Sequence, residues 1–359
     1  MRQRRRQPND KSSSAIHAYA NCARIALLGC WCDSRTCFGE HREEIMPRRL
    51  TALFAAAAFL CPGSAMAWWD GGHMQIAAVA YDRLSTDIRV KVDALIRLNP
   101  DYERWVAGVR GDLAAQHAFV RASVWADDIK SDSAYTRSGD RPDGRHADRN
   151  AGYYDHLVHD YWHYRDVGFS PDGTAVDDPD PVNALTQIKL LTEGLSEASG
   201  LPDGVRSYDL VWLLHLVGDA HQPLHATARF TAVDSNGDRG GNDVDVIDAT
   251  GVTMSLHAYW DSRFGGYVTP QGAIRDGLSD QRTKLPEPDA ARATIADPEQ
   301  WFAESRDFAM QFAYAAPVGP AKGPYKLDRE YETKARDVSR EQAAVAGARL
   351  ANLITAALK

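Results

Sequence analysis

Residues 207 to 225 constrain the fold more than any other part of the chain. The run SYDLVWLLHLVGDAH, 207 to 221, is nearly all apolar yet ends in histidine and aspartate, and Pro223 follows it. Such a run predicts a buried helix that the proline stops. His215 and Asp219 are four residues apart, so a helix places both side chains on one face. Because an unpaired buried carboxylate is strongly unfavourable, Asp219 needs a cation or a dense hydrogen-bond shell.

Further histidines and aspartates extend this pattern. His257 and Asp261 repeat the four-residue spacing in SLHAYWD, and His225 lies just past the proline. The motifs WWDGGH, VWADD and YWHYRD add three more candidates, namely His73, Asp127 and His163. Zinc is held by three or four imidazole, carboxylate or thiolate ligands. The recurrence of such residues therefore favours metal binding.

Each of these residues has a simpler interpretation when taken alone. An isolated histidine–aspartate pair on a helix is more often a side-chain hydrogen bond than a metal site. Asp127 could cap a helix, His163 could be a core histidine, and His73 could face solvent near a helix start. His221 points off the face that His215 and Asp219 share, so we expect it to support the site without binding metal. Only the co-occurrence of the motifs raises metal binding above these alternatives.

The remaining sequence predicts an all-α fold, a single mainly helical domain over residues 68–359 with long polar loops. Helical periodicity is seen at 73–84, 181–198, 255–264 and 340–359, and a further helix is expected between Ser85 or Thr86 and Pro100. The polar stretches 131–152 and 166–182 predict loops. Residues 231–244 are rich in turn-forming residues, and we expect a short β-hairpin there.

The N-terminal part of the chain has the pattern of an export signal. Residues 46–67, MPRRLTALFAAAAFLCPGSAMA, combine a basic start, an apolar stretch and a small-residue end. Cleavage after Ala67 would make Trp68 the first mature residue, and we expect a secreted or periplasmic protein. Lipoprotein processing at Cys61 is an alternative that the preceding residues match poorly. Residues 1–45 have no place in such a signal, and we expect them to be a non-native upstream extension.

Cysteine usage and charge limit what the mature chain can be. All five cysteines precede Trp68, so disulfides cannot hold the domain, and metal is a candidate for that role. Residues 1–67 carry ten Lys and Arg and five Asp and Glu, which leaves 31 and 44 in residues 68–359, a formal net charge of −13. This balance argues against a broad basic surface for duplex DNA. No apolar run in this part is long enough for a membrane-spanning helix.

Seven motifs together give the chain a family resemblance. They are WWDGGH, WADD, WHYRD, HLVGDAHQPLH, RGGNDV, SLHAYWD and AGARLANLI, and they run in this order from Trp68 to about Ile354. The set resembles the zinc-dependent single-strand nucleases of the S1/P1 family, which are related to zinc-dependent bacterial phospholipase C. HLVGDAHQPLH is specific by itself, whereas the other motifs are specific only in combination.

The resemblance implies three zinc ions (Zn2+) and nine ligand residues. It implies one zinc at Asp127, His163, His215 and Asp219. It implies a second at the amino group and carbonyl of Trp68, at His73 and at Asp219, which bridges the pair. It implies a third at His225, His257 and Asp261. Ligation by Trp68 would make zinc loading depend on signal cleavage.

The resemblance also implies an activity, the hydrolysis of RNA and single-stranded DNA to products with a 5′-phosphate. Removal of 3′-phosphates from nucleotides is a further expectation, and we expect a monomer. Asp166 is our candidate for orienting the attacking water or a ligand; hydrogen bonding to a ligand alone is the alternative. Asn242, with Gly241 beside it, matches the base-contacting position of the family; a pure turn role is the alternative.

Two other functions compete with this one. A lipid phosphodiesterase like phospholipase C could use the same scaffold, but those enzymes resemble the SLHAYWD motif with glutamate in place of Asp261, and RGGND also favours the nuclease. A non-catalytic zinc-binding protein is the third possibility. An incomplete ligand set would favour it, and all nine positions carry a suitable residue.

Overall fold

The computed structural model describes residues 68–264 and 269–359. Chain contacts divide the protein into residues 1–59 and residues 60–359. The expected upstream extension (1–45) and signal peptide (46–67) lie outside the described residues, so they remain predictions. The helices are α1 (Asp70–Arg83), α2 (Thr86–Ile96), α3 (Tyr102–Val106), α4 (Ala114–Ala122), α5 (Trp125–Asp128), α6 (Ala184–Leu195), α7 (Asp203–Asp219), α8 (Leu256–Asp261), α9 (Pro270–Leu278), α10 (Ala290–Ala293), α11 (Pro298–Phe308) and α12 (Arg329–Ala357).

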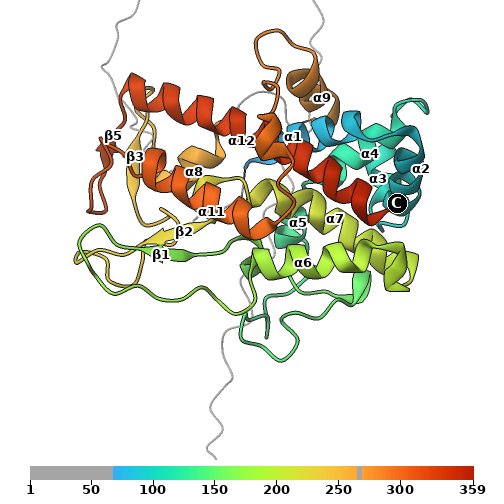
Figure 1. Cartoon of the computed structure of the whole chain (residues 1–359), viewed down its shortest axis with the longest axis horizontal. Coiled ribbons are helices and arrows are strands. Elements are labelled where there is room, and N and C mark those ends of the chain that lie inside the picture. The colour runs from blue at the N-terminus through green and yellow to red at the C-terminus, as the bar shows by residue number, and fades with distance from the viewer. Residues whose placement is uncertain (1–67, 265–268) are drawn as a thin grey trace, which may run out of the picture. The chain divides into compact units, whose positions relative to one another are not determined.

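Helix α7 lies at the centre of the domain, as its sequence predicts. Every residue from Ser207 to Asp219 is buried, which fits a helix that is apolar around its whole circumference. Helices α1, α2, α5, α6 and α12 all contact it. Figure 1 shows α6 and α7 side by side, and α12 crossing the domain next to α1. The segment with most metal-capable side chains is therefore also the one around which the core is built.

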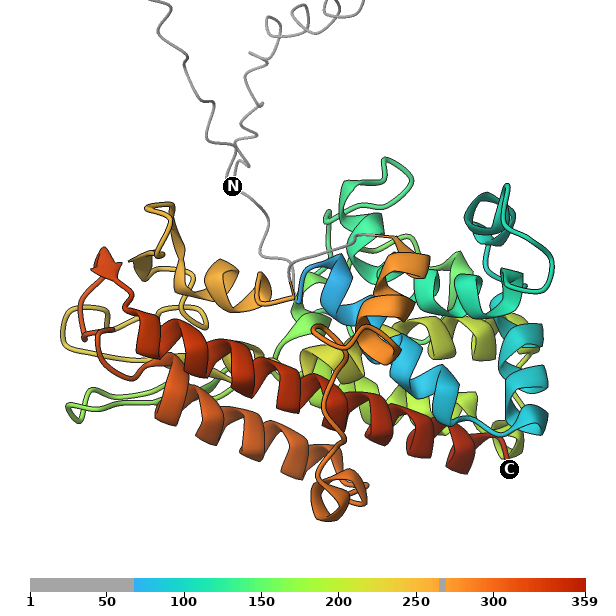
Figure 2. The same ribbon diagram turned by 90° about the horizontal axis from the view of Figure 1, so that it is seen from above.

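The other predicted helices are confirmed, with bounds set by their caps. Ser85, not Thr86, caps α2, since its hydroxyl accepts a hydrogen bond from the amide of Ile88. Asn183 begins α6 with a reciprocal capping box that involves Thr186. Helix α12 is longer than the predicted segment 340–359 and begins at Arg329. Its first half is only partly apolar and buries Tyr331, Ala335 and Val338, and α11 runs alongside it (Figure 2).

The strands are few and short, which confirms a mainly helical domain. They are β1 (Val167–Phe169), β2 (Thr227–Arg229), β3 (Asp245–Ile247), β4 (Thr253–Ser255) and β5 (Tyr325–Lys326). The expected hairpin exists, but residues 231–244 do not form it. It joins β3 and β4 just beyond them. Residues 231–244 instead form consecutive turns, with left-handed backbone at Gly237, Arg239, Gly240 and Gly241.

Four one-turn helices fix the connections around the site. They are η1 (Ile129–Ser131), η2 (Gly152–Tyr154), η3 (Asp160–His163) and η5 (Pro223–His225). Away from the site, η4 (Glu197–Ser199) joins α6 to α7, and the π-helix η6 (Ala309–Ala313) extends α11. Strand β1 pairs in parallel with β2, and this pairing brings the segment after η3 beside the segment after η5. Among the described residues, no helix is both long and apolar enough to cross a membrane.

Candidate metal centre

Two overlapping groups of side chains meet at the C-terminal end of α7. In the first, Nδ1 of His163 lies 3.0 Å from Nε2 of His215 and 3.1 Å from Oδ2 of Asp219. The second joins His73 of α1 and Asp127 of α5 to the same His215. Nε2 of His73 also lies 3.3 Å from the other carboxylate oxygen of Asp219. Asp219 therefore presents one oxygen to each side, as a bridging ligand would.

A third group forms where η5 approaches α8. Nε2 of His225 faces Nε2 of His257 at 3.1 Å, and Asp261 lies 3.5 Å from the latter. The amide of Gln222 donates to Asp261 Oδ1 at 2.6 Å and orients this carboxylate. Eight of the nine predicted ligand positions thus supply three compact groups from six elements, and Trp68 is the ninth.

Backbone carbonyls orient three of the imidazoles. Nδ1 of His215 donates to the carbonyl of Ser123 at 2.7 Å, and Nδ1 of His225 donates to that of His163 at 2.7 Å. Nδ1 of His257 donates to the carbonyl of Gly240 at 2.8 Å. Each of these bonds places the proton on Nδ1 and leaves the Nε2 lone pair facing the group. Metal-binding histidines are oriented in this way.

The unsatisfied atoms of the three groups fit bound cations. Both nitrogens of His73, Oδ1 of Asp219 and Oδ2 of Asp261 are buried without a hydrogen-bond partner. The Nε2 atoms of His225 and His257 would oppose two lone pairs at 3.1 Å. Buried polar groups of this kind require a partner, and a cation between them would satisfy all of them at once. The donor set of imidazoles and carboxylates suits zinc.

Burial lowers the pKa of the histidines in these groups and raises the pKa of the aspartates. A histidine must be neutral to bind a metal ion, so the shift of the histidines favours metal binding. Desolvation lowers the pKa of His73 and of His257 to about 4, so both imidazoles are neutral at pH 7. Desolvation also raises the pKa of Asp219 to about 7 and the pKa of Asp261 well above its usual value. Without a cation, burial therefore favours the protonated form of both carboxyls. A metal ion would displace the protons.

Two glycines allow the close approach of the segments. A Cβ atom at Gly218 would lie 2.6 Å from Nδ1 of His73, so only glycine lets α1 bring this histidine against α7. Gly240 has a φ of +61°, and a Cβ atom there would collide with the carbonyl oxygen of Leu224. The RGGND turn is therefore needed to bring its carbonyl to His257, which is a role beyond reversing the chain.

Trp68 lies beside the first two groups. It is fully buried, its indole Nε1 donates to the carbonyl of Gly218 at 3.0 Å, and its ring packs edge-on against Phe264. The next amide, that of Trp69, donates to the carbonyl of Asp261 at 3.1 Å. The backbone at Trp68 and Trp69 is therefore held between α7 and α8, while the role of Trp68 as a zinc ligand stays a prediction.

The three remaining predicted residues lie on segments next to the centre: Asp166 follows η3, and Gly241 and Asn242 lie in the turn before β3. Asp166 joins none of the three groups; burial, together with the charges of Asp238 and Asp180, raises its pKa to about 7. Asn242 is half-buried and its amide donates to the carbonyl of Arg239. Gly241 is buried and its carbonyl accepts from the amide of His257 at 3.3 Å.

Sequence reasoning missed Lys130. This lysine is buried beside the centre, and its Nζ donates to Asp127 Oδ1 at 2.7 Å. Burial and then the charge of Lys130 lower the pKa of His163 well below its usual value. The three-residue spacing in WADDIK was a usable signal, because it puts both side chains on the same side of a helical turn. Lys130 adds positive charge to a domain whose net charge is negative.

Comparison with known proteins now assigns this metal-capable helical domain to a class of nucleic-acid hydrolases. The profile of the S1/P1 nuclease family matches residues 68–359, so the chain belongs to this family. Nuclease S1 of Aspergillus oryzae is similar to it, with 24% identity over 249 residues that cover 67% of this chain and 70% of the relative. Members of the family are zinc enzymes, and the histidine and aspartate groups described above could hold such ions. The resemblance predicted from the motifs is confirmed.

Proposed function

We propose that the protein is an exported zinc-dependent phosphodiesterase that hydrolyses RNA and single-stranded DNA to 5′-phosphate products. The observation that supports this most is the convergence of eight of the nine predicted ligand residues into three adjoining buried groups with unsatisfied donor atoms. We further propose that the enzyme removes 3′-phosphates from nucleotides, that it acts as a monomer and that it works in the periplasm or outside the cell.

The nine residues would divide among three ions. One Zn2+ would be held by Asp127, His163, His215 and Asp219, and a second by Trp68, His73 and Asp219. The third would be held by His225, His257 and Asp261. When bound, zinc supplies the Lewis acidity that polarises the phosphate and activates water. The buried imidazoles stay neutral around it, since desolvation disfavours their protonated forms.

The surrounding residues would hold and orient the substrate. The ammonium of Lys130 stabilises negative charge near Asp127, where a phosphate would approach. Asp166, with a pKa of about 7, can take up or release a proton near neutral pH, and we assign it to orienting the attacking water. Asn242 and Gly241 lie on the turn behind His257 and would contact a base. Single strands suit such a site because their bases can splay apart.

A panel of substrates tests the proposal directly. Purified protein is incubated with RNA, single-stranded DNA, duplex DNA and a phosphatidylcholine emulsion, and the product ends are identified. We expect turnover of RNA and single-stranded DNA, with phosphate on the 5′ end. Turnover of lipid alone would replace the nuclease by the phospholipase-like activity, and turnover of no substrate by zinc-loaded protein would favour the non-catalytic alternative.

A further inference from the structure

We propose that Arg349 of α12 is a positioning residue for the metal centre, acting through His221 on the turn that carries Asp219 and His225. The inference rests on the proposed zinc-binding function. It concerns the side of α7 that faces away from the ligand groups, where a buried ionic network joins α7 to α11 and α12.

The network is continuous and fully buried at its centre. The guanidinium of Arg349 donates to Nε2 of His221 at 2.9 Å and forms an ion pair with Glu304 of α11 at 2.8 Å. Its Nε donates to the carbonyl of Arg292 at 3.0 Å. Arg349 is 1% exposed and His221 is not exposed. The guanidinium is held in one geometry because Arg292, His221 and Glu304 bind it from three directions.

The same helices satisfy the carbonyls at the end of α7. Nδ1 of His221 donates to the carbonyl of Val217 at 2.7 Å. Ser305 of α11 donates to the carbonyl of Ala220 at 2.6 Å, and Gln342 of α12 donates to that of His221 at 3.2 Å. The last carbonyls of a helix lack partners within it, so these contacts fix where α7 ends and how the chain leaves it.

The turn held in this way orients two of the ligand groups. Asp219, two residues before His221, is the last residue of α7; it belongs to the group with His163 and His215, and its Oδ1 faces His73 at 3.3 Å. Gln222, directly after His221, donates from its side chain to Asp261 of the third group. The amide of His225 donates to the carbonyl of Gln222 at 3.0 Å. A shift of His221 would therefore displace ligands on both sides of the centre.

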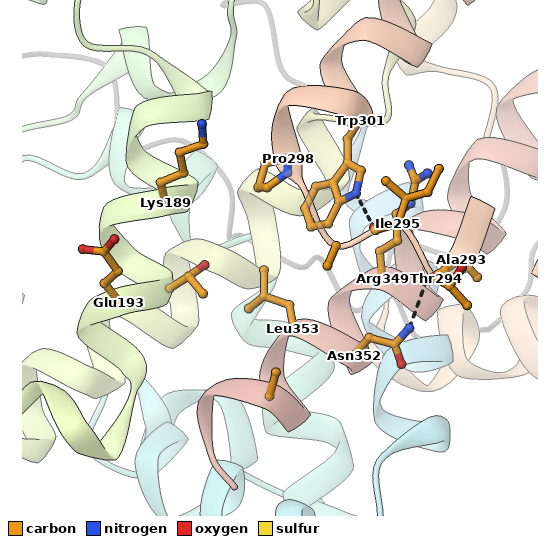
Figure 3. Close-up of a pocket in the computed structure, with 13 residues that line it drawn as sticks. Lys189, Glu193, Ala293, Thr294, Ile295, Pro298, Trp301, Arg349, Asn352 and Leu353 are labelled. Carbon is orange, nitrogen blue, oxygen red and sulfur yellow. Dashed lines mark hydrogen bonds between the residues drawn. The ribbon is translucent and has the colours of Figure 1, made fainter. Parts of the chain in front are cut away.

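A cavity of about 610 Å³ next to Arg349 provides a matched control. Arg349, Trp301, Asn352 and Leu353 line it (Figure 3). Leu353 lies one helical turn after Arg349 on α12 and forms part of the same cavity wall. It has no role in the ionic network. Truncation of Leu353 thus perturbs the same packing without releasing His221.

The experiment compares Arg349→Met, Arg349→Lys and Leu353→Ala in the mature protein. Zinc affinity is measured by competition with a chelator, and amide hydrogen exchange of residues 215–225 is measured on zinc-saturated protein. We expect Arg349→Met to bind zinc about 10- to 100-fold more weakly and to exchange faster in this segment. Arg349→Lys should recover part of the affinity. Leu353→Ala should lower the Tm while it keeps wild-type zinc affinity.

Wild-type zinc affinity and exchange in Arg349→Met would overturn the proposal, as would an equal loss of affinity in Leu353→Ala. If Arg349→Met fails to fold, Glu304→Gln decides, because it removes the pairing charge at a partly exposed position. The experiment can contradict the positioning role of Arg349 and the proposed nuclease function independently of each other. A wild-type protein that binds zinc without cleaving nucleic acid contradicts the proposed function and leaves this test intact.

Discussion

His215 belongs to two of the three side-chain groups, so its removal should disturb the centre strongly. His215→Ala should reduce hydrolysis of single-stranded DNA to background and lower the Tm, because the first proposed zinc site loses a ligand and metal binding is coupled to folding. His117→Ala, at a half-buried position on α4, is the control and should retain activity. Initial rates and thermal unfolding of both variants measure the effect. Near-normal activity of His215→Ala would contradict the assignment of the centre.

Asp209 predicts a pH dependence of stability that is independent of the metal. It is buried on α7 with Oδ2 unpaired, and burial raises its pKa to about 7. The unfolded chain releases this proton near pH 4 and the folded protein near pH 7. The free energy of unfolding should therefore fall as the pH rises from about 4 to about 7, by up to about 4 kcal/mol. Urea unfolding of zinc-saturated Asp209→Asn should show a shallower pH slope; an unchanged slope would contradict this.

At this scale the sequence indicated the candidate ligands but not their surroundings. Spacing along one helix suffices to pair His215 with Asp219, and His257 with Asp261. The carbonyls that orient the imidazoles come from segments far away in the chain, such as Ser123 for His215. Periodicity carries no information about such contacts. Lys130 could have been found from its spacing to Asp127.

Helix α7 offers two glycines with opposite expected effects. Gly218→Ala places a Cβ atom 2.6 Å from His73, so we expect weaker zinc binding and lower stability despite the higher helix propensity of alanine. Gly204→Ala on the same helix meets open space and should stabilise the protein by up to about 1 kcal/mol. Thermal unfolding and zinc titration of the pair separate the contact from propensity. Equal effects of the two substitutions would exclude a role for the close approach.

Among the elements, the long apolar helices were predictable and the strands were not. Helices α1, α6 and α7 follow from periodicity and capping residues. The parallel pairs β1–β2 and β3–β5 join segments that lie far apart in the sequence, and each strand has only two or three residues. The hairpin was predicted at residues 231–244 because these residues are rich in turn formers, but it follows them in the sequence. The carbonyls of Gly240 and Gly241 accept hydrogen bonds from His257, and these glycines do not form a two-residue hairpin turn.

At the scale of the whole domain, zinc would take the place of disulfides. Its proposed ligands come from α1, α5, η3, α7, η5 and α8, so the ions would link six elements of the domain. Removal of zinc with a chelator should lower the free energy of unfolding by about 4 kcal/mol for each site, if the free zinc concentration was a thousand times the Kd of that site. Readdition of zinc should restore the Tm, whereas a reducing agent should have no effect. A Tm insensitive to the chelator would contradict this account.

The buried position of Trp68 has a practical consequence for producing the protein. An affinity tag fused ahead of this residue would turn the proposed amine ligand into a peptide nitrogen, and a polyhistidine tag would add competing imidazoles next to the centre. Lys359 is exposed just past the end of α12, so a tag belongs there. Recombinant protein that keeps an initiator methionine before Trp68 would lack the proposed amine ligand and should be inactive.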